Sequence, residues 1–274
     1  MRRFYQVDVF ASGPLTGNPL AVVAGADGLS QGQMLALARW TNLSETTFLL
    51  APLTPAVDYR LRIFTPRGEI PFAGHPTLGS CHVWLHETGA EGVDRVVQEC
   101  AAGLIDIRVS AESLAFAAPP PLRCGPLGAP LVAEIAADLR IARADVIGDQ
   151  WADNGAGWAA VMLRDADAVL ALEPGIVRRD IGVIGPHPPG GPADFEVRAF
   201  YPKNGATAED PVTGSLNAAL AEWLIGAGRA SAPYRVRQGT ALGHEGRVSV
   251  TQDDEGRIWI GGQTTVIVSG TVAL

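Results

Sequence analysis

The sequence predicts an α/β chain made of two similar halves, and an internal repeat is the main observation behind this. Residues 62–66 (RIFTP) recur as residues 198–202 (RAFYP), almost half the chain away. Each copy is followed by a turn-rich stretch and then by a helix-like segment that closes at a glycine, Gly89 or Gly226. A duplicated unit sets the whole architecture, so the two halves are expected to share one fold.

Strands and helices are expected in both halves. The 32 Gly and 20 Pro residues imply many turns and therefore short strands. Alternating apolar residues predict strands over 5–10, 46–50, 59–64, 104–109 and 247–250. Helices are expected over 31–40, from His75 to Trp84, and over 217–225.

Capping residues mark the ends of the expected elements. The spacing of Ser30 and Gln33 is that of a capping box. Pro76 suits a first helical turn, and Thr213 or Ser215 is the candidate N-cap of the later helix. The triproline at 119–121 marks the linker. The expected domains are residues 1–117, joined by a C-terminal strand at about 264–274, and residues 118–263.

Composition excludes several classes of protein. The chain has 21 basic and 29 acidic residues, a net charge of −8, and no run of like charges, unlike a nucleic-acid binder. No stretch is apolar enough to span a membrane. The three cysteines, Cys81, Cys100 and Cys124, show no CxxC spacing, so we expect small buried residues in a reducing cytoplasm. A small-molecule substrate is the expected partner.

The two helix starts are the candidate ligand site. If the halves pack about a pseudo-two-fold axis, two helix N-termini face one cleft, each with unpaired N–H groups and about half a positive charge. Such a cleft suits a carboxylate. Gly74 and Gly214 at the two starts would let a ligand approach the backbone closely.

Glu45 is the candidate acid/base. It precedes the apolar strand over 46–50, where partial burial would raise its pKa toward the range for proton transfer near neutral pH. A strand-edge glutamate in water is the alternative reading. Residues 154–157 (NGAG) replace it in the rough half-to-half alignment, which predicts a site with one base.

Other readings of the same residues have less support. His82 and His86 could hold a metal on one helix face, but no third ligand is placed with them. His75, Asp210 and Ser215 could form a hydrolytic triad, but no GxSxG elbow surrounds the serine. Glycine motifs for nucleotide phosphates are absent.

At these residues the chain resembles the PhzF-like (phenazine biosynthesis-like) isomerases of the diaminopimelate-epimerase-like superfamily. The resemblance spans nearly the whole chain and rests on the segments 8–10 (DVF), 17–22 (GNPLAV), 42–46 (NLSET), 72–79 (FAGHPTLG) and 209–215 (EDPVTGS). It implies two α/β halves, each a strongly bent, mostly antiparallel sheet around a central helix. It also implies a homodimer and catalysis without metal or organic cofactor.

The resemblance further implies roles for individual residues. Glu45 would shuttle the proton, and His75 and Asp210 would contact and polarise the substrate. Thr213, Ser215 and the amides around Gly74 and Gly214 would hold the substrate carboxylate. The expected activity is isomerisation of a small cyclic carboxylic or amino acid. A non-catalytic carboxylate-binding protein and a cofactor-independent amino-acid epimerase are the alternatives.

Epimerases of the superfamily use two cysteines, one at each helix start. The corresponding positions here are expected to be Ala73 and Pro211, neither of which can carry a proton. This expectation favours isomerisation by a single base.

Overall fold

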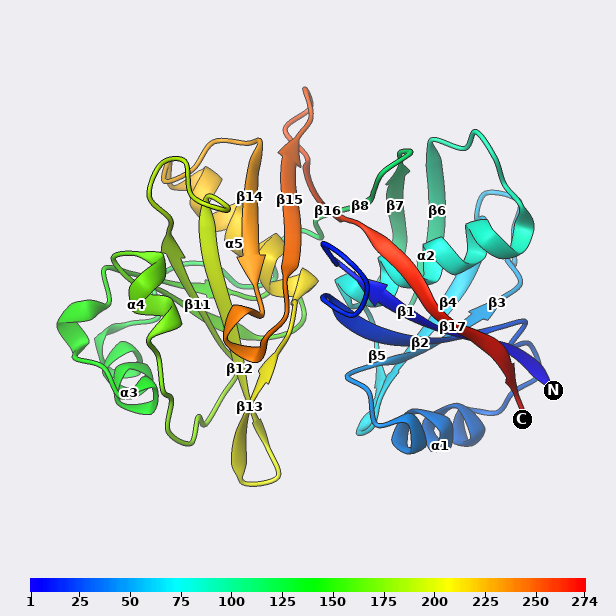
Figure 1. The fold of residues 1–274 in the computed structure, drawn as a ribbon, viewed down its shortest axis with the longest axis horizontal. Helices are drawn as coiled ribbons and strands as arrows, with labels where there is room; N and C mark the ends of the chain where they lie inside the picture. The colour runs from blue at the N-terminus through cyan, green and yellow to red at the C-terminus, as the bar shows by residue number, and fades with distance from the viewer. The chain divides into compact units, whose positions relative to one another are not determined.

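The computed structural model describes all residues from 1 to 274, and they form two compact units (Figure 1). Unit 1 contains residues 1–117 and 261–274, and unit 2 contains residues 118–260. None of the helices combines the length and apolar character that crossing a membrane requires.

Unit 1 is a sheet with two helices. Its strands are β1 (Arg2–Val9), β2 (Asn18–Ala24), β3 (Thr46–Leu50), β4 (Tyr59–Thr65), β5 (Gly68–Ile70), β6 (Arg95–Cys100), β7 (Gly103–Val109), β8 (Leu114–Ala117) and β17 (Thr264–Val272). Their order across the sheet is β17, β1, β2, β3, β4, β6, β7 and β8, with β5 forming a hairpin on β4. The helices are α1 (Gln31–Thr41) and α2 (Gly74–Thr88).

Unit 2 repeats this plan. Its strands are β9 (Gly148–Ala152), β10 (Trp158–Met162), β11 (Ile181–Pro186), β12 (Phe195–Lys203), β13 (Ala206–Asp210), β14 (Tyr234–Gln238) and β15 (Gly246–Gln252), and β16 (Ile258–Gly262) continues past its end at residue 260. The order is β9, β10, β11, β12, β14 and β15, with β13 as a hairpin on β12. Its helices are α3 (Ala129–Leu139), α4 (Ala166–Leu170) and α5 (Gly214–Gly226), with 3₁₀ turns at Arg143–Asp145 and Thr240–Leu242.

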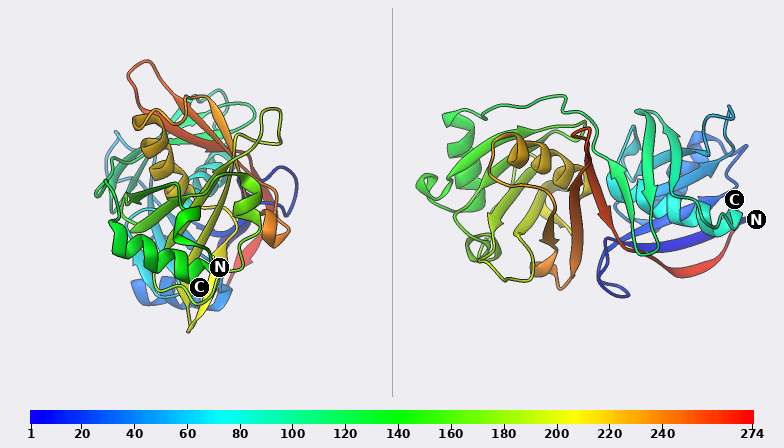
Figure 2. Two further views of the ribbon diagram at one scale, coloured as in Figure 1. Left: turned by 90° about the vertical axis from the view of Figure 1, so that its left-hand side faces the viewer. Right: turned by 90° about the horizontal axis from the view of Figure 1, so that it is seen from above.

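The pairing pattern confirms the predicted duplication. In unit 1, β2 pairs parallel with β3, β3 antiparallel with β4, and β4 parallel with β6. In unit 2, β10, β11, β12 and β14 repeat these three pairings in the same order and sense. Helices α2 and α5 occupy the same place in the two series, each between a hairpin and the next parallel strand. The predicted fold class, bent sheets with a central helix in each half, is confirmed (Figures 1 and 2).

Burial explains why α2 and α5 are central. The first six residues of α2 that follow Gly74 are all buried, and α5 buries Leu216, Leu220 and Leu224. A helix that is apolar on most sides must be covered by other elements, which the bent sheet provides. Helix α1 instead buries only Met34, Leu37 and Ala38.

Several local predictions are confirmed and a few boundaries differ. The Ser30–Gln33 capping box is formed at the start of α1. Helix α2 begins at Gly74 but extends past Trp84 to Thr88, and α5 begins at Gly214, ahead of the expected residue 217. Strand β1 ends before Phe10, because the φ of 60° there turns the chain out of the strand.

Candidate functional site

Glu45 and His75 lie together at the start of α2 in unit 1. Glu45 directly precedes β3, and its Oε2 atom is 3.4 Å from Nε2 of His75. Both side chains are largely buried, with exposed fractions of 16% for Glu45 and 5% for His75. Burial lowers the pKa of His75 to about 3, so its imidazole is neutral near pH 7. A neutral imidazole beside a carboxyl group can both accept and donate a proton.

Local structure places Glu45 at this point. Asn42 ends α1 in the left-handed conformation, with φ 54°, which turns the chain directly into β3. The Thr46 and Thr41 hydroxyls are 2.8 Å apart, and Ser80 of α2 donates to the Thr47 hydroxyl at 2.9 Å. These contacts attach β3 to both helices and fix the residue before the strand.

The α2 start has no side-chain cap. Ala73 occupies the N-cap position in an extended conformation and cannot accept a hydrogen bond through its side chain. The first-turn N–H groups of Gly74 and His75 are therefore free of a side-chain acceptor, and Pro76 has no N–H. An anion is the natural partner for such amides.

The α5 start in unit 2 is held by a network around Gln238 of β14. Thr213 occupies the N-cap position, but its hydroxyl donates to Asp210 Oδ2 at 2.6 Å instead of capping the helix. The Gln238 amide accepts from the Thr213 N–H at 3.0 Å and donates to the Thr213 hydroxyl at 2.9 Å. Asn217 donates to Gln238 at 2.9 Å. Gln238 was not among the residues predicted from the sequence.

Ser215 lies inside the first turn of α5, so the alternative that it caps the helix is wrong. Its hydroxyl accepts a hydrogen bond from the Trp158 indole at 3.2 Å, and its carbonyl accepts from the Asn154 amide at 2.9 Å. Asp153 orders the loop that carries Asn154 by accepting from the N–H groups of Gly155 and Gly157. The loop thus positions the serine, and Asn154 Oδ1 has no hydrogen-bond partner.

The structure corrects the expected alignment of the two helix starts. Arg62 binds Glu69 through two hydrogen bonds, and Arg198 binds Glu209 in the same way. The first pair is 7 positions apart and the second 11, because the β12–β13 hairpin is longer than β4–β5. The N-caps Ala73 and Thr213 therefore correspond, not Ala73 and Pro211. Neither of the corresponding residues is a cysteine.

The expectation that unit 2 lacks a counterpart of Glu45 is also wrong. Thr46 pairs with Phe64 across β3 and β4, and Ile181 pairs with Phe200 across β11 and β12. The residue before β11, Asp180, therefore corresponds to Glu45. Residues 154–157 instead belong to the loop between β9 and β10.

Asp180 faces α5 by strand alternation. Ile181 and Val183 point into a core cluster that includes α3, so the residues between and before them point to the opposite side. There Gly182 packs so closely on Leu216 that an added Cβ would lie 2.4 Å from it. Ser215, the second residue of α5, corresponds to His75, the second residue of α2.

The cysteines differ in exposure, and the possible metal pair His82 and His86 has no third ligand. Cys81 is buried and Cys100 half-buried, but Cys124 is exposed, which corrects the expectation for that residue. Burial raises the pKa of the Cys81 thiol to about 12. No group of three or more His, Cys, Asp or Glu side chains is arranged to hold a metal.

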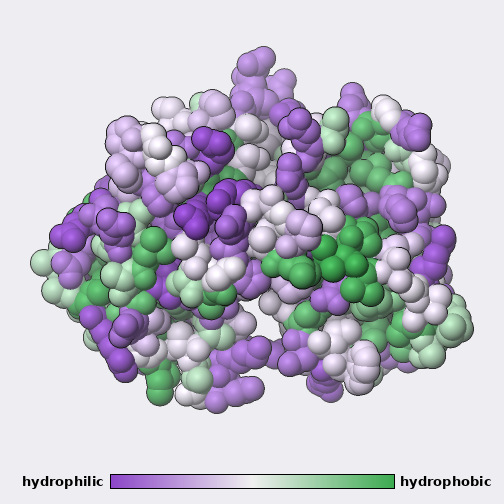
Figure 3. Space-filling model, viewed as in Figure 1, coloured by the Kyte–Doolittle hydropathy of each residue, from purple (hydrophilic) through white to green (hydrophobic).

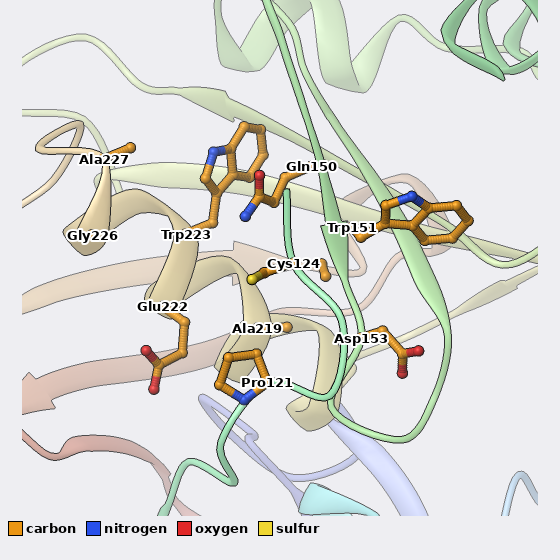
Figure 4. A pocket seen from close by; sticks show the side chains of 11 residues that line it. Pro121, Cys124, Gln150, Trp151, Asp153, Ala219, Glu222, Trp223, Gly226 and Ala227 are labelled. Carbon is orange, nitrogen blue, oxygen red and sulfur yellow. The ribbon is translucent and has the colours of Figure 1, made fainter. Parts of the chain in front are cut away.

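A cavity of about 370 Å³ lies in unit 2 and is lined by none of the predicted site residues (Figure 4). Its lining comes from α5 and the residue after it, from β9 and the residue after it, and from the segment that precedes α3. The residues are Pro121, Cys124, Gln150, Trp151, Ala152, Asp153, Ala219, Glu222, Trp223, Gly226 and Ala227. None of them was a predicted site residue, so this cavity is not the candidate active site.

Comparison with known proteins assigns the family. A family model described as phenazine biosynthesis-like protein matches residues 7–270. Antisense-enhancing sequence 1 of Schizosaccharomyces pombe is 33% identical, over 97% of both chains. Trans-2,3-dihydro-3-hydroxyanthranilate isomerase of Pseudomonas aeruginosa is 47% identical, over 38% of this chain and 36% of that one.

A solved structure extends the likeness to the whole fold. The PhzF-family phenazine biosynthesis protein of Bacillus anthracis superposes with a TM-score of 0.84 at 24% identity, covering 100% of this chain and 99% of that one. The chain therefore belongs to the phenazine biosynthesis-like protein family, a family of isomerases with a diaminopimelate-epimerase-like fold.

Proposed function

We propose that this enzyme isomerises a small cyclic carboxylic or amino acid, with Glu45 as the group that moves the proton. The observation that carries the proposal is the buried Glu45–His75 contact of 3.4 Å at an uncapped helix start. Glu45 removes a proton from a carbon next to an unsaturated or carbonyl system and returns it nearby on the same face. The neutral His75 ring polarises the substrate and can hold a hydrogen bond to the carboxyl group.

The other predicted residues bind the substrate in this proposal. The amides of Gly74 and Gly214 and the hydroxyl of Ser215 donate to the substrate carboxylate. Asp210 contacts and polarises the substrate, and Thr213, which donates to Asp210 Oδ2 at 2.6 Å, lies with the residues that hold the carboxylate. The enzyme acts in the cytoplasm as a homodimer and uses neither metal nor organic cofactor, since the proton transfer needs only these side chains.

The name of the Pseudomonas aeruginosa relative supplies the substrate to test, trans-2,3-dihydro-3-hydroxyanthranilate. We expect wild-type enzyme to convert it and Glu45→Gln to lose about 10²–10⁴-fold in turnover, the usual effect of removing an acid/base group. The variant should still bind the substrate, because the glutamine side-chain amide has nearly the same volume as the carboxyl group of Glu45. Glu91→Gln, a change of an exposed glutamate in unit 1, is the matched control.

Three outcomes would contradict the proposal. Unchanged turnover in Glu45→Gln would remove the glutamate from the mechanism. Tight binding of this and related cyclic acids by wild-type protein, with no product detected by NMR, would favour a non-catalytic carboxylate-binding protein. Exchange of the α-hydrogen of an amino acid with inversion would favour an epimerase.

A further inference from the structure

Three arginines gather on one face of the β14–β15 hairpin in unit 2. In the antiparallel register Arg237 lies directly opposite Arg247, and Arg235 lies opposite Ser249. Val236 and Val248 between them are buried on the other face of the hairpin. Since side chains alternate along a strand, the three arginines and Ser249 share one face, which we call the arginine face.

The charges of the arginine face are poorly balanced within the protein. The guanidinium groups of Arg235 and Arg237 form no hydrogen bond or ion pair, and Arg237 Nε is buried without a partner. Arg247 has one carboxylate partner, the largely exposed Glu245, at 3.8 Å. The chain as a whole carries a net charge of −8, so this local excess of positive charge is unusual.

Holding these arginines together opposes folding. Like charges directly opposite each other in a sheet are destabilising. Burial and the neighbouring Arg237 charge lower the pKa of Arg247, the direction expected for a cation that lacks compensation.

Glu196 balances the charge of the arginine face only in part, since its carboxylate favours the charged form of Arg247 without pairing with it. It lies opposite Arg237 on β12, but its two carboxylate oxygens already accept from His187 at 2.9 Å and from Thr240 at 2.6 Å. It forms no ion pair with any of the three arginines.

The surface over these strands is accessible. Helix α4 packs against β11 and β12, while Arg235 is exposed and Arg237, Arg247 and Ser249 are half-buried. Figure 3 shows strongly hydrophilic side chains gathered over β14 and β15 in the view of Figure 1.

We propose that the arginine face binds the phosphate group of a small phosphorylated molecule. Cross-strand neighbours have Cβ atoms about 4.5–5.5 Å apart, so the Arg237 and Arg247 guanidinium groups can meet on one compact anion. A tetrahedral phosphate has enough oxygens to accept two hydrogen bonds from each guanidinium, and the Ser249 hydroxyl can add another. Three arginines on an acidic protein are too few for a nucleic-acid surface. This proposal does not depend on the isomerase reaction.

The test is a titration with inorganic phosphate at constant ionic strength, followed by calorimetry and by the thermal unfolding midpoint. We expect phosphate to bind and to raise the midpoint of the wild-type protein. Arg237→Gln and Arg247→Gln should each weaken phosphate binding about tenfold or more, because each removes charge-assisted hydrogen bonds. The matched control is Arg257→Gln, which changes an exposed arginine of the same unit that is already paired with Asp253 and Glu255.

The phosphate-free proteins give a second readout. Arg237→Gln should unfold at the same temperature as the wild type or higher, since it removes like-charge repulsion. Wild-type protein that fails to bind phosphate at millimolar concentration would overturn the proposal. Equal phosphate affinity in Arg237→Gln, Arg247→Gln and Arg257→Gln would overturn it as well.

Discussion

The starts of α2 and α5 have corresponding positions in the two units but different side chains. In unit 1 the residue before β3 is Glu45 and the second residue of α2 is His75, and their side chains lie 3.4 Å apart. In unit 2 the corresponding residues are Asp180 and Ser215. Ser215 accepts a hydrogen bond from Trp158, and a serine at this position supplies no imidazole to exchange a proton with a neighbouring carboxyl group. The duplication therefore supplies two helix starts without a side-chain cap, while the Glu45–His75 contact belongs to unit 1.

The same contrast appears in the two hairpins. The Arg62–Glu69 pair of unit 1 is partly exposed, with side-chain fractions of 30% and 27%, whereas Arg198 and Glu209 of unit 2 are buried at 7% and 8%. Arg198 also donates to the carbonyl of Leu172 at 2.8 Å. The same pair of hydrogen bonds is thus partly exposed to water in unit 1 and buried in unit 2. The contribution of each pair to the free energy of unfolding can be measured and compared.

The largest expected effect on stability comes from breaking the buried pair. Glu209→Gln leaves a buried guanidinium without its counter-charge and should reduce the free energy of unfolding by about 3–5 kcal/mol. The matched change Glu69→Gln should cost less than about 1 kcal/mol, because water and salt screen the exposed pair. Urea unfolding of both variants checks the contrast. Equal losses of unfolding free energy in the two variants would contradict the expectation that the buried pair contributes more to stability than the partly exposed one.

A second effect on stability is expected from the titration of His75. Its folded-state pKa, about 3, lies below the ordinary value of 6.5, so the unfolded chain binds the proton more tightly. The contribution of this residue to stability is therefore lost as pH falls from about 6.5 toward 3, at up to about 1.4 kcal/mol per pH unit. His75→Asn should reduce the slope of the free energy of unfolding against pH by up to about 1.4 kcal/mol per pH unit in this range, which corresponds to one proton. A slope identical to that of the wild type would contradict a neutral buried imidazole.

Local signals explain which features could be predicted from the sequence. The capping box at Ser30, the proline in the first turn of α2 and the repeated RxFxP segment each depend on residues close together in the chain. They locate the helices, the duplication and the position of Glu45 before its strand.

Features that depend on long-range register could not be predicted in this way. The longer β12–β13 hairpin shifts the alignment between the halves, so Thr213 and not Pro211 corresponds to Ala73. The counterpart of Glu45 follows from strand pairing, which identifies Asp180. Gln238 reaches the α5 start from a strand 25 positions away from Thr213, and no local pattern indicates that contact.

Asp180 offers the most direct comparison with Glu45. In the proposed isomerisation Glu45 holds the proton between its removal and its return. Exchange of that carboxyl proton with D₂O before the return should leave deuterium at the accepting carbon of the product. We expect Glu45→Gln to reduce deuterium incorporation by at least about 10²-fold and Asp180→Asn to change it by less than about threefold. Loss of incorporation in Asp180→Asn, with incorporation retained in Glu45→Gln, would assign the proton transfer to unit 2 and contradict the account.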